Sequence, residues 1–139
     1  MKKNIIYLAI IFLLSISTVY FATRVYFPKV SAIEMKLWLE ANEINKTCPS
    51  IIDDATRLDN ATVFPNNCFQ YNYTLFKYLR SEVNPEMAIK SIEPKIIANI
   101  KKDPGFKFFK DAQTTMVYNY RDRNGEFTFK ITITPDKYR

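Results

Sequence analysis

The chain has 139 residues, of which 47% are hydrophobic and 24% are charged. This length fits one small domain, and the composition excludes a disordered chain. The sequence contains no histidine and only two cysteines. These absences exclude Ser-His-Asp and Cys-His catalysis, histidine-ligated zinc and a site with four thiolate ligands. We therefore expect no enzyme activity, no metal site and no cofactor.

The formal net charge of +6 is concentrated at the N-terminus. Residues 1–29 contain four basic and no acidic residues, whereas residues 30–139 contain 16 basic and 14 acidic residues. Charges in the larger part alternate in sign along the chain and form no basic cluster of the kind that binds nucleic acid. We expect no nucleic-acid partner.

An uncharged apolar segment, residues 5–22, follows two lysines. A helix of this length would span about 27 Å, close to the thickness of a thin hydrocarbon core. The pattern predicts an uncleaved signal anchor and transmembrane helix over residues 1–23, a link over residues 24–30 and a folded domain over residues 31–139. The alternative is a cleaved signal peptide, but Tyr20 is too large for the position two residues before Ala22.

The first half of the domain predicts one helix and two strands. A capping box at Ser31 and Glu34 starts a helix that continues to residue 47, shortly before Pro49. Strands are predicted over residues 56–64 and 69–75, and the second alternates apolar with polar residues.

The second half predicts a helix followed by a hairpin. Asn84 and Pro85 start a helix over residues 85–102, which Pro94 is expected to kink or divide into two pieces. One further helical turn is expected over residues 106–110. Asn124 and Gly125 are the strongest hairpin signal, and they lie between strands over residues 115–121 and 126–134.

The predicted order is helix–strand–strand, twice. We interpret it as a pseudo-duplicated α-β-β unit that forms an α+β fold. Because each strand has one apolar and one polar face, the expected sheet has four antiparallel strands with the helices on one face.

Several short motifs occur in a fixed order. They are Ile44-Asn45 with Pro49 and Asp53, Thr56-Arg57-Leu58-Asp59, Tyr71-x-Tyr73-Thr74-Leu75, Asp103-Pro104, and Tyr118-x-Tyr120-x-Asp122-x-x-Gly125. In this order the motifs resemble a group of small, uncharacterised exported or inner-membrane proteins of Gram-negative bacteria, over most of residues 43–134. The resemblance implies export, a small domain and a bacterial origin, and it supplies no activity that could be transferred to this chain. The group pairs a helix cysteine with one at the C-terminus, where this chain has Lys102 and Arg139.

The two cysteines are Cys48, at the end of the first helix, and Cys68, at the start of the second strand. In an oxidising compartment, two cysteines predict one disulfide, which would stabilise the domain by roughly 3 kcal/mol. The alternatives are two free thiols or a reactive cysteine, and the second has no histidine to activate it.

Two charged pairs are the candidate interaction residues. Arg57 and Asp59 share one face of a strand, and Arg121 and Asp122 lie on the last hairpin. The alternative for the first pair is a structural ion pair at the corner between helix and strand. Tyrosines 71, 73, 118 and 120 are interpreted as core residues of the sheet, with a stacking platform as the alternative.

The expected function is a non-catalytic binding or accessory module of the bacterial cell envelope. We expect a single-pass inner-membrane protein with its C-terminal domain in the periplasm and another envelope protein as its partner. One alternative is a periplasmic inhibitor or immunity protein against a toxin or hydrolase. A soluble periplasmic protein with a cleaved signal, and an enzyme that uses only Asp, Glu, Tyr or Lys, are the others.

Overall fold

The computed structural model describes Tyr7, residues 12–21 and residues 30–139. The chain divides into two compact units, Met1–Ser31 and Ala32–Arg139. The second unit contains the sheet and the core, and each unit is described by itself.

The first unit corrects the expectation of a membrane-spanning helix. Among the described residues, no helix is long and apolar enough to cross a membrane. The predicted single-pass inner-membrane location therefore loses its structural basis. The other residues of the predicted segment, 1–6, 8–11 and 22–23, lie outside the described residues.

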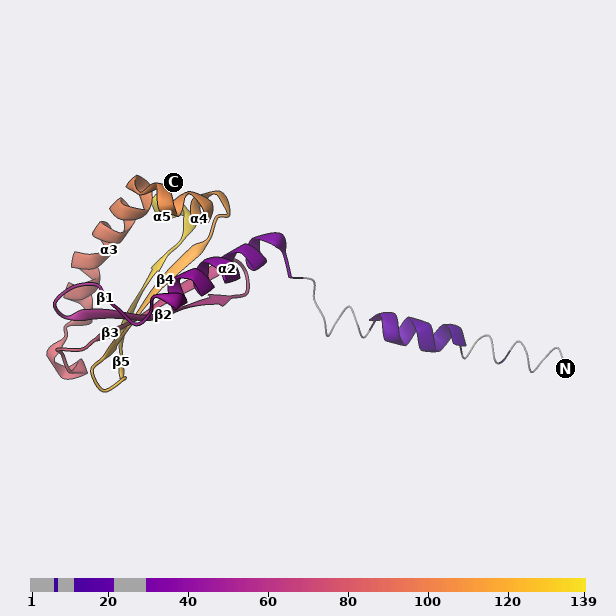
Figure 1. The fold of residues 1–139 in the computed structure, drawn as a ribbon, viewed down its shortest axis with the longest axis horizontal. Coiled ribbons are helices and arrows are strands. Elements are labelled where there is room, and N and C mark those ends of the chain that lie inside the picture. Colours follow the sequence, from indigo (N-terminus) through magenta and orange to yellow (C-terminus); the bar gives the residue numbers. More distant parts are fainter. Residues whose placement is uncertain (1–6, 8–11, 22–29) are drawn as a thin grey trace. The chain divides into compact units, whose positions relative to one another are not determined.

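The second unit is built on a mixed five-stranded sheet (Figure 1). Its strands, in both chain and spatial order, are β1 (Ser50–Ile51), β2 (Thr56–Phe64), β3 (Cys68–Leu75), β4 (Thr115–Asp122) and β5 (Phe127–Ile133). The β1–β2, β2–β3 and β4–β5 pairs are antiparallel, whereas β3 and β4 are parallel.

The expected sheet of four antiparallel strands is therefore wrong in two respects. The two residues of β1 add a short strand that no periodicity could indicate. The parallel pair arises because residues 76–114 cross over from the end of β3 to the start of β4, so that Tyr71 pairs with Tyr118. A parallel pair requires such a crossover, whereas a hairpin would make the strands antiparallel.

The second unit also contains four helices, which are α2 (Ala32–Lys46), α3 (Pro85–Lys102), α4 (Lys107–Asp111) and α5 (Pro135–Tyr138). Two 3-10 turns, η1 (Arg80–Glu82) and η2 (Pro104–Phe106), flank α3. The predicted start of α3 is confirmed, since the Asn84 side chain accepts a hydrogen bond of 3.1 Å from the Met87 amide. The expected division at Pro94 is not observed, because α3 continues through it as one helix.

The core lies on one face of the sheet. Leu37 and Ala41 of α2 and Ile100 of α3 are buried in the same cluster as the apolar residues of β2 to β5. The opposite face presents polar side chains, such as Gln70 and Asn72 of β3. The two faces differ in this way because successive strand residues point to opposite sides of the sheet.

Asn45 of α2 covers part of the free edge of β2. Its amide nitrogen donates to the Ala61 carbonyl at 2.9 Å, and its amide oxygen accepts from the Ala61 N–H at 2.6 Å. The short strand β1 reaches only Arg57 and Leu58. The Asn45 side chain therefore takes the place that a longer neighbouring strand would occupy.

Replacing Asn45 with alanine is expected to lower the free energy of unfolding by about 1–3 kcal/mol, because both backbone groups of Ala61 lose their partner. Urea unfolding followed by circular dichroism measures the change. The exposed Asn42→Ala variant of the same helix is the control and should remain within about 0.5 kcal/mol of wild type. Equal values for the two variants would contradict this role of Asn45.

Candidate functional site

Arg57 and Asp59 lie on the polar face of the sheet, where they form an ion pair. The Arg57 Nε donates to the Asp59 Oδ1 at 2.6 Å, and the Thr74 hydroxyl donates to the Asp59 Oδ2 at 2.5 Å. A bulge in β2 between Leu58 and Asn60 accommodates Asp59. Both side chains are partly exposed, and their contacts join β2 to β3.

The structure brings Arg121 to the same face but separates Asp122 from it. Arg57 pairs with Thr74 and Thr74 pairs with Arg121, so the three lie in one row across the sheet. Arg121 is exposed and donates to the Gly125 carbonyl at 2.8 Å. Asp122 is only 1% exposed.

Asp122 holds two turns together. Its carboxylate accepts hydrogen bonds from the backbone amides of Arg80, Asn124 and Glu126, at distances of 2.8–2.9 Å. Burial raises the pKa of Asp122, but the three amide donors lower it by more, so that its pKa lies below the usual value. The sequence did not indicate this role, because Arg80 lies far from Asp122 along the chain.

The expected disulfide between Cys48 and Cys68 is wrong, because both are free thiols. Cys48 packs against the core, whereas Cys68 precedes the buried Phe69 and so points to the polar face. Along β2 the two also lie toward opposite ends, since Cys68 pairs with Phe64 and Ser50, just after Cys48, pairs with Leu58. A disulfide needs Cα atoms within about 7 Å.

A groove lies on the helix side of the sheet, with a cavity of about 450 Å³. Its floor consists of Tyr71 and Tyr73 of β3 and Tyr118 and Tyr120 of β4. Its walls combine residues of α3, of the turn between β1 and β2, and Phe106. The wall residues are Ile92, Lys95, Ile96 and Asn99 on α3, and Ile52, Asp53 and Thr56 near the turn.

The parallel pairing of β3 and β4 builds the floor. Tyr71 pairs with Tyr118 and Tyr73 with Tyr120, and their ring centroids lie 5.2 and 5.0 Å apart with nearly parallel planes. The stack continues to Phe129 of β5, 4.5 Å from Tyr120. Because the rings cover each other's faces, the groove meets mainly their edges and hydroxyl groups.

The groove remains open because the two long helices rest on the flanks of the sheet. Helix α2 packs mainly against β2, and α3 packs against β5 and α5. Figure 1 shows the two helices apart from each other. A hollow therefore remains between α3 and the tyrosines of the middle strands.

The tyrosines of the floor are neutral at physiological pH. Burial raises the pKa of all four, and that of Tyr120 reaches about 12. The carboxylates of Glu40 and Asp53 add to the rise at Tyr71 and Tyr120, respectively. Their hydroxyl groups are therefore hydrogen-bond donors and acceptors rather than phenolates.

The Asp53 carboxylate also shapes the rim of the groove. It accepts hydrogen bonds from the Ala55 amide at 2.9 Å and the Thr56 amide at 2.8 Å. The bond from Ala55 is the main reason that the pKa of Asp53 lies below the usual value. These bonds fix the turn between β1 and β2 that forms one wall.

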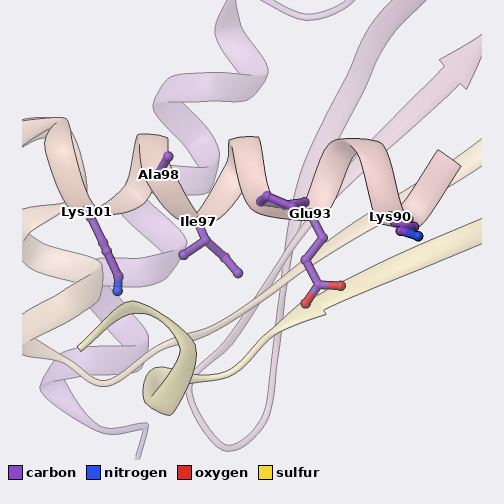
Figure 2. A pocket seen from close by; sticks show the side chains of 6 residues that line it. Lys90, Glu93, Ile97, Ala98 and Lys101 are labelled. Carbon is purple, nitrogen blue, oxygen red and sulfur yellow. The ribbon is translucent and has the colours of Figure 1, made fainter. Parts of the chain in front are cut away.

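A second hollow of about 590 Å³ lies along α3 and is lined by Lys90, Glu93, Pro94, Ile97, Ala98 and Lys101. Figure 2 shows Glu93, Ile97 and Lys101 on the same side of the helix. Glu93 is already paired with Lys137 of α5 at 2.7 Å. All residues that line this hollow belong to one helix, so the hollow is shallower than the groove.

In the part of the chain that the structure describes, no group of three or more His, Cys, Asp and Glu side chains could hold a metal ion. The groove itself contains apolar walls, neutral hydroxyl groups and two charged side chains. This chemistry suits binding of another molecule rather than proton transfer or nucleophilic attack.

The alternation of residues along the strands predicted that the four tyrosines lie in the core, but it did not indicate the groove. The signal in the sequence that pointed toward the groove was the Tyr-x-Tyr pattern, which occurs on two strands. A tyrosine at a core position carries a hydroxyl group that needs a hydrogen-bond partner. That signal alone could not show that the two strands are neighbours.

Three solved structures have a similar fold. A Pseudomonas aeruginosa protein described as secreted is 12% identical, with a TM-score of 0.62 and coverage of 80% of this chain and 100% of that one. The pilotin EpsS of the Vibrio vulnificus type 2 secretion system is 11% identical, with a TM-score of 0.60 and coverage of 77% and 92%. The Vibrio cholerae type II secretion system pilotin AspS is 10% identical, with a TM-score of 0.57 and coverage of 76% and 91%.

A search of curated proteins found no match. The model of the family described as "domain of unknown function (DUF8479)" matches residues 32–129. This region contains α2, α3 and most of the sheet, including all four tyrosines of the groove. The chain therefore belongs to the DUF8479 family.

Proposed function

We propose that this protein is a non-catalytic accessory protein of the bacterial cell envelope, and that it binds a segment of an envelope secretion protein in the groove between α3 and the tyrosine floor. Two of the structures with a similar fold are named as pilotins of type 2 secretion systems, and a third is described as secreted. At 10–12% identity these likenesses concern the fold. They support the proposal by indicating the kind of partner.

The observation that carries the proposal is the open hollow over the middle of the sheet. A small domain buries the apolar face of its sheet under its own helices, and an apolar hollow that stays open is a typical binding site. Here the hollow has aliphatic walls and an aromatic floor. Arg57, Asp59 and Arg121 on the opposite face remain the candidates for a separate polar contact.

Site-specific photocrosslinking in living bacteria tests this proposal. A benzophenone amino acid replaces Lys95, an exposed residue in the groove wall, in one variant of the full chain. The matched control carries the same group at Lys130, an exposed lysine of β5 that pairs with Asn119 on the polar face. We expect irradiation to join the Lys95 variant, and not the Lys130 variant, to one envelope secretion protein.

Three results would contradict the proposal. The Lys95 variant would form no discrete adduct, both variants would form the same adduct, or the adduct would contain a protein from outside the envelope. An adduct from Lys130 alone would favour the polar face with Arg57 and Arg121 as the binding surface.

A further inference from the structure

The hydroxyl groups on the floor of the groove have no partner within the described part of the chain. Tyr71, Tyr118 and Tyr120 are only 8%, 6% and 6% exposed, yet no described residue hydrogen-bonds their hydroxyl groups. Among fully buried side-chain nitrogen and oxygen atoms of the described residues, only the Thr114 Oγ1 lacks a partner. The tyrosine hydroxyl oxygens therefore reach the open groove.

A buried tyrosine elsewhere in the same core behaves differently. The Tyr138 hydroxyl donates to the Thr114 carbonyl at 2.8 Å. Buried hydroxyl groups are normally satisfied in this way, because an unpaired one costs about 1–3 kcal/mol. The hydroxyl groups of the groove floor instead open to the groove, where a bound molecule can supply their partners.

The charges around the floor limit the chemistry of that molecule. The groove lining holds one carboxylate, Asp53, and one ammonium group, Lys95, so its charges balance. Both side chains are exposed to solvent. A charged group of the ligand would lose its water without meeting a net opposite charge, whereas an uncharged acceptor loses less.

We propose that the tyrosine hydroxyls select a peptide segment that presents uncharged hydrogen-bond acceptors between aliphatic side chains. These acceptors are the amide or hydroxyl groups of Asn, Gln, Ser or Thr, or main-chain carbonyls. The inference rests on the proposed function, and it adds that the tyrosine hydroxyl groups recognise the partner. The aliphatic side chains contact Ile92 and Ile96, and the acceptors face the floor.

A peptide fits the groove better than a compact small molecule. The wall near the β1–β2 turn is open, since Ile52 is 54% exposed and Asp53 is exposed. A small ligand in a well-formed site has most of its surface buried, and here one side would stay in water. A peptide segment can fill the groove with a few side chains and continue beyond its open side.

Selection from a phage library of random dodecapeptides on the purified full chain tests the inference. Enriched peptides are then titrated by fluorescence anisotropy against wild type and the double variant Tyr73→Phe/Tyr120→Phe. Phenylalanine keeps the stacked rings and removes only the hydroxyls. The control is Tyr78→Phe, which alters an exposed tyrosine outside the groove.

We expect the enriched peptides to combine aliphatic residues with Asn, Gln, Ser or Thr. The double variant should bind them about tenfold more weakly, as expected for the loss of two hydrogen bonds to neutral acceptors. The control should bind as wild type does. Thermal melting of all three proteins should agree, which verifies that the groove is intact.

Equal binding by wild type and the double variant, enrichment of acidic peptides, or no enrichment at all would each overturn the inference. These results leave the crosslinking experiment unaffected, so the two proposals can fail separately. An adduct at Lys95 together with unchanged binding by the double variant would mean that the groove binds its partner without using the hydroxyls. Absence of the Lys95 adduct would remove the proposed function itself.

Discussion

Replacing Phe69 with alanine is expected to lower the free energy of unfolding by about 3–5 kcal/mol, the usual cost of removing a buried phenylalanine side chain. Phe69 lies on the central strand β3 and is 0% exposed. Its ring meets Phe109 of α4 edge to face, with centroids 5.0 Å apart, and lies 5.0 Å from Tyr71. The substitution would leave a cavity between the sheet and α4.

Urea unfolding of the full chain measures this effect, with the slope of the transition as a check that the same surface unfolds. The control is Phe127→Ala on the edge strand β5, where the side chain is 53% exposed. The control should lose less than about 1 kcal/mol, because little of its apolar surface is buried. Similar losses in both variants would mean that Phe69 is not a central core residue.

Replacing Asp122 with alanine is expected to lower the melting temperature clearly at neutral pH. The substitution leaves the backbone amides of Arg80, Asn124 and Glu126 without their acceptor in a buried position. The exposed Asp54→Ala variant is the control and should melt close to wild type. Differential scanning calorimetry measures both.

The stabilising effect of Asp122 should depend on pH. Its pKa in the folded protein lies below the usual value, because the three amide hydrogen bonds outweigh the effect of burial. Its contribution is therefore fully present above the pKa of the unfolded chain, about 3.9, and is lost as the pH falls through the lower pKa of the folded state. The difference in melting temperature between wild type and Asp122→Asn should shrink below about pH 4. A difference that stays constant to pH 2 would contradict this assignment.

The groove also clarifies how tyrosines can belong to a core and to a site at once. Tyr71 and Tyr118 stack as core residues, as the alternation of their strands predicted. Their hydroxyl ends line an open cavity, because α2 and α3 cover only the flanks of the sheet. Periodicity reports which face of a strand is buried, and it contains no information on how completely the helices cover that face.

Local signals predicted most elements of this fold. Asn84 begins α3, Gly125 lies in the tight turn between β4 and β5 with a φ of 82°, and the alternation in β3 separates its two faces. Each of these signals acts over a few residues through a cap, a turn or a side-chain direction. For this reason the order of the longer helices and strands could be derived without coordinates, whereas the short elements β1 and α5 could not.

The strand neighbours and the sites were decided by the tertiary structure. The crossover of residues 76–114 makes β3 and β4 parallel, which stacks Tyr71 on Tyr118. The registers of β2 with β1 and β3 place Cys48 and Cys68 toward opposite ends of β2. Side-chain periodicity is the same in a parallel and an antiparallel strand, so the sequence could specify that each strand forms and which face it buries. Strand pairing joins residues that lie far apart in the chain. Which strands become neighbours, and in which direction, therefore depends on how the segment between them packs and not on the strands alone.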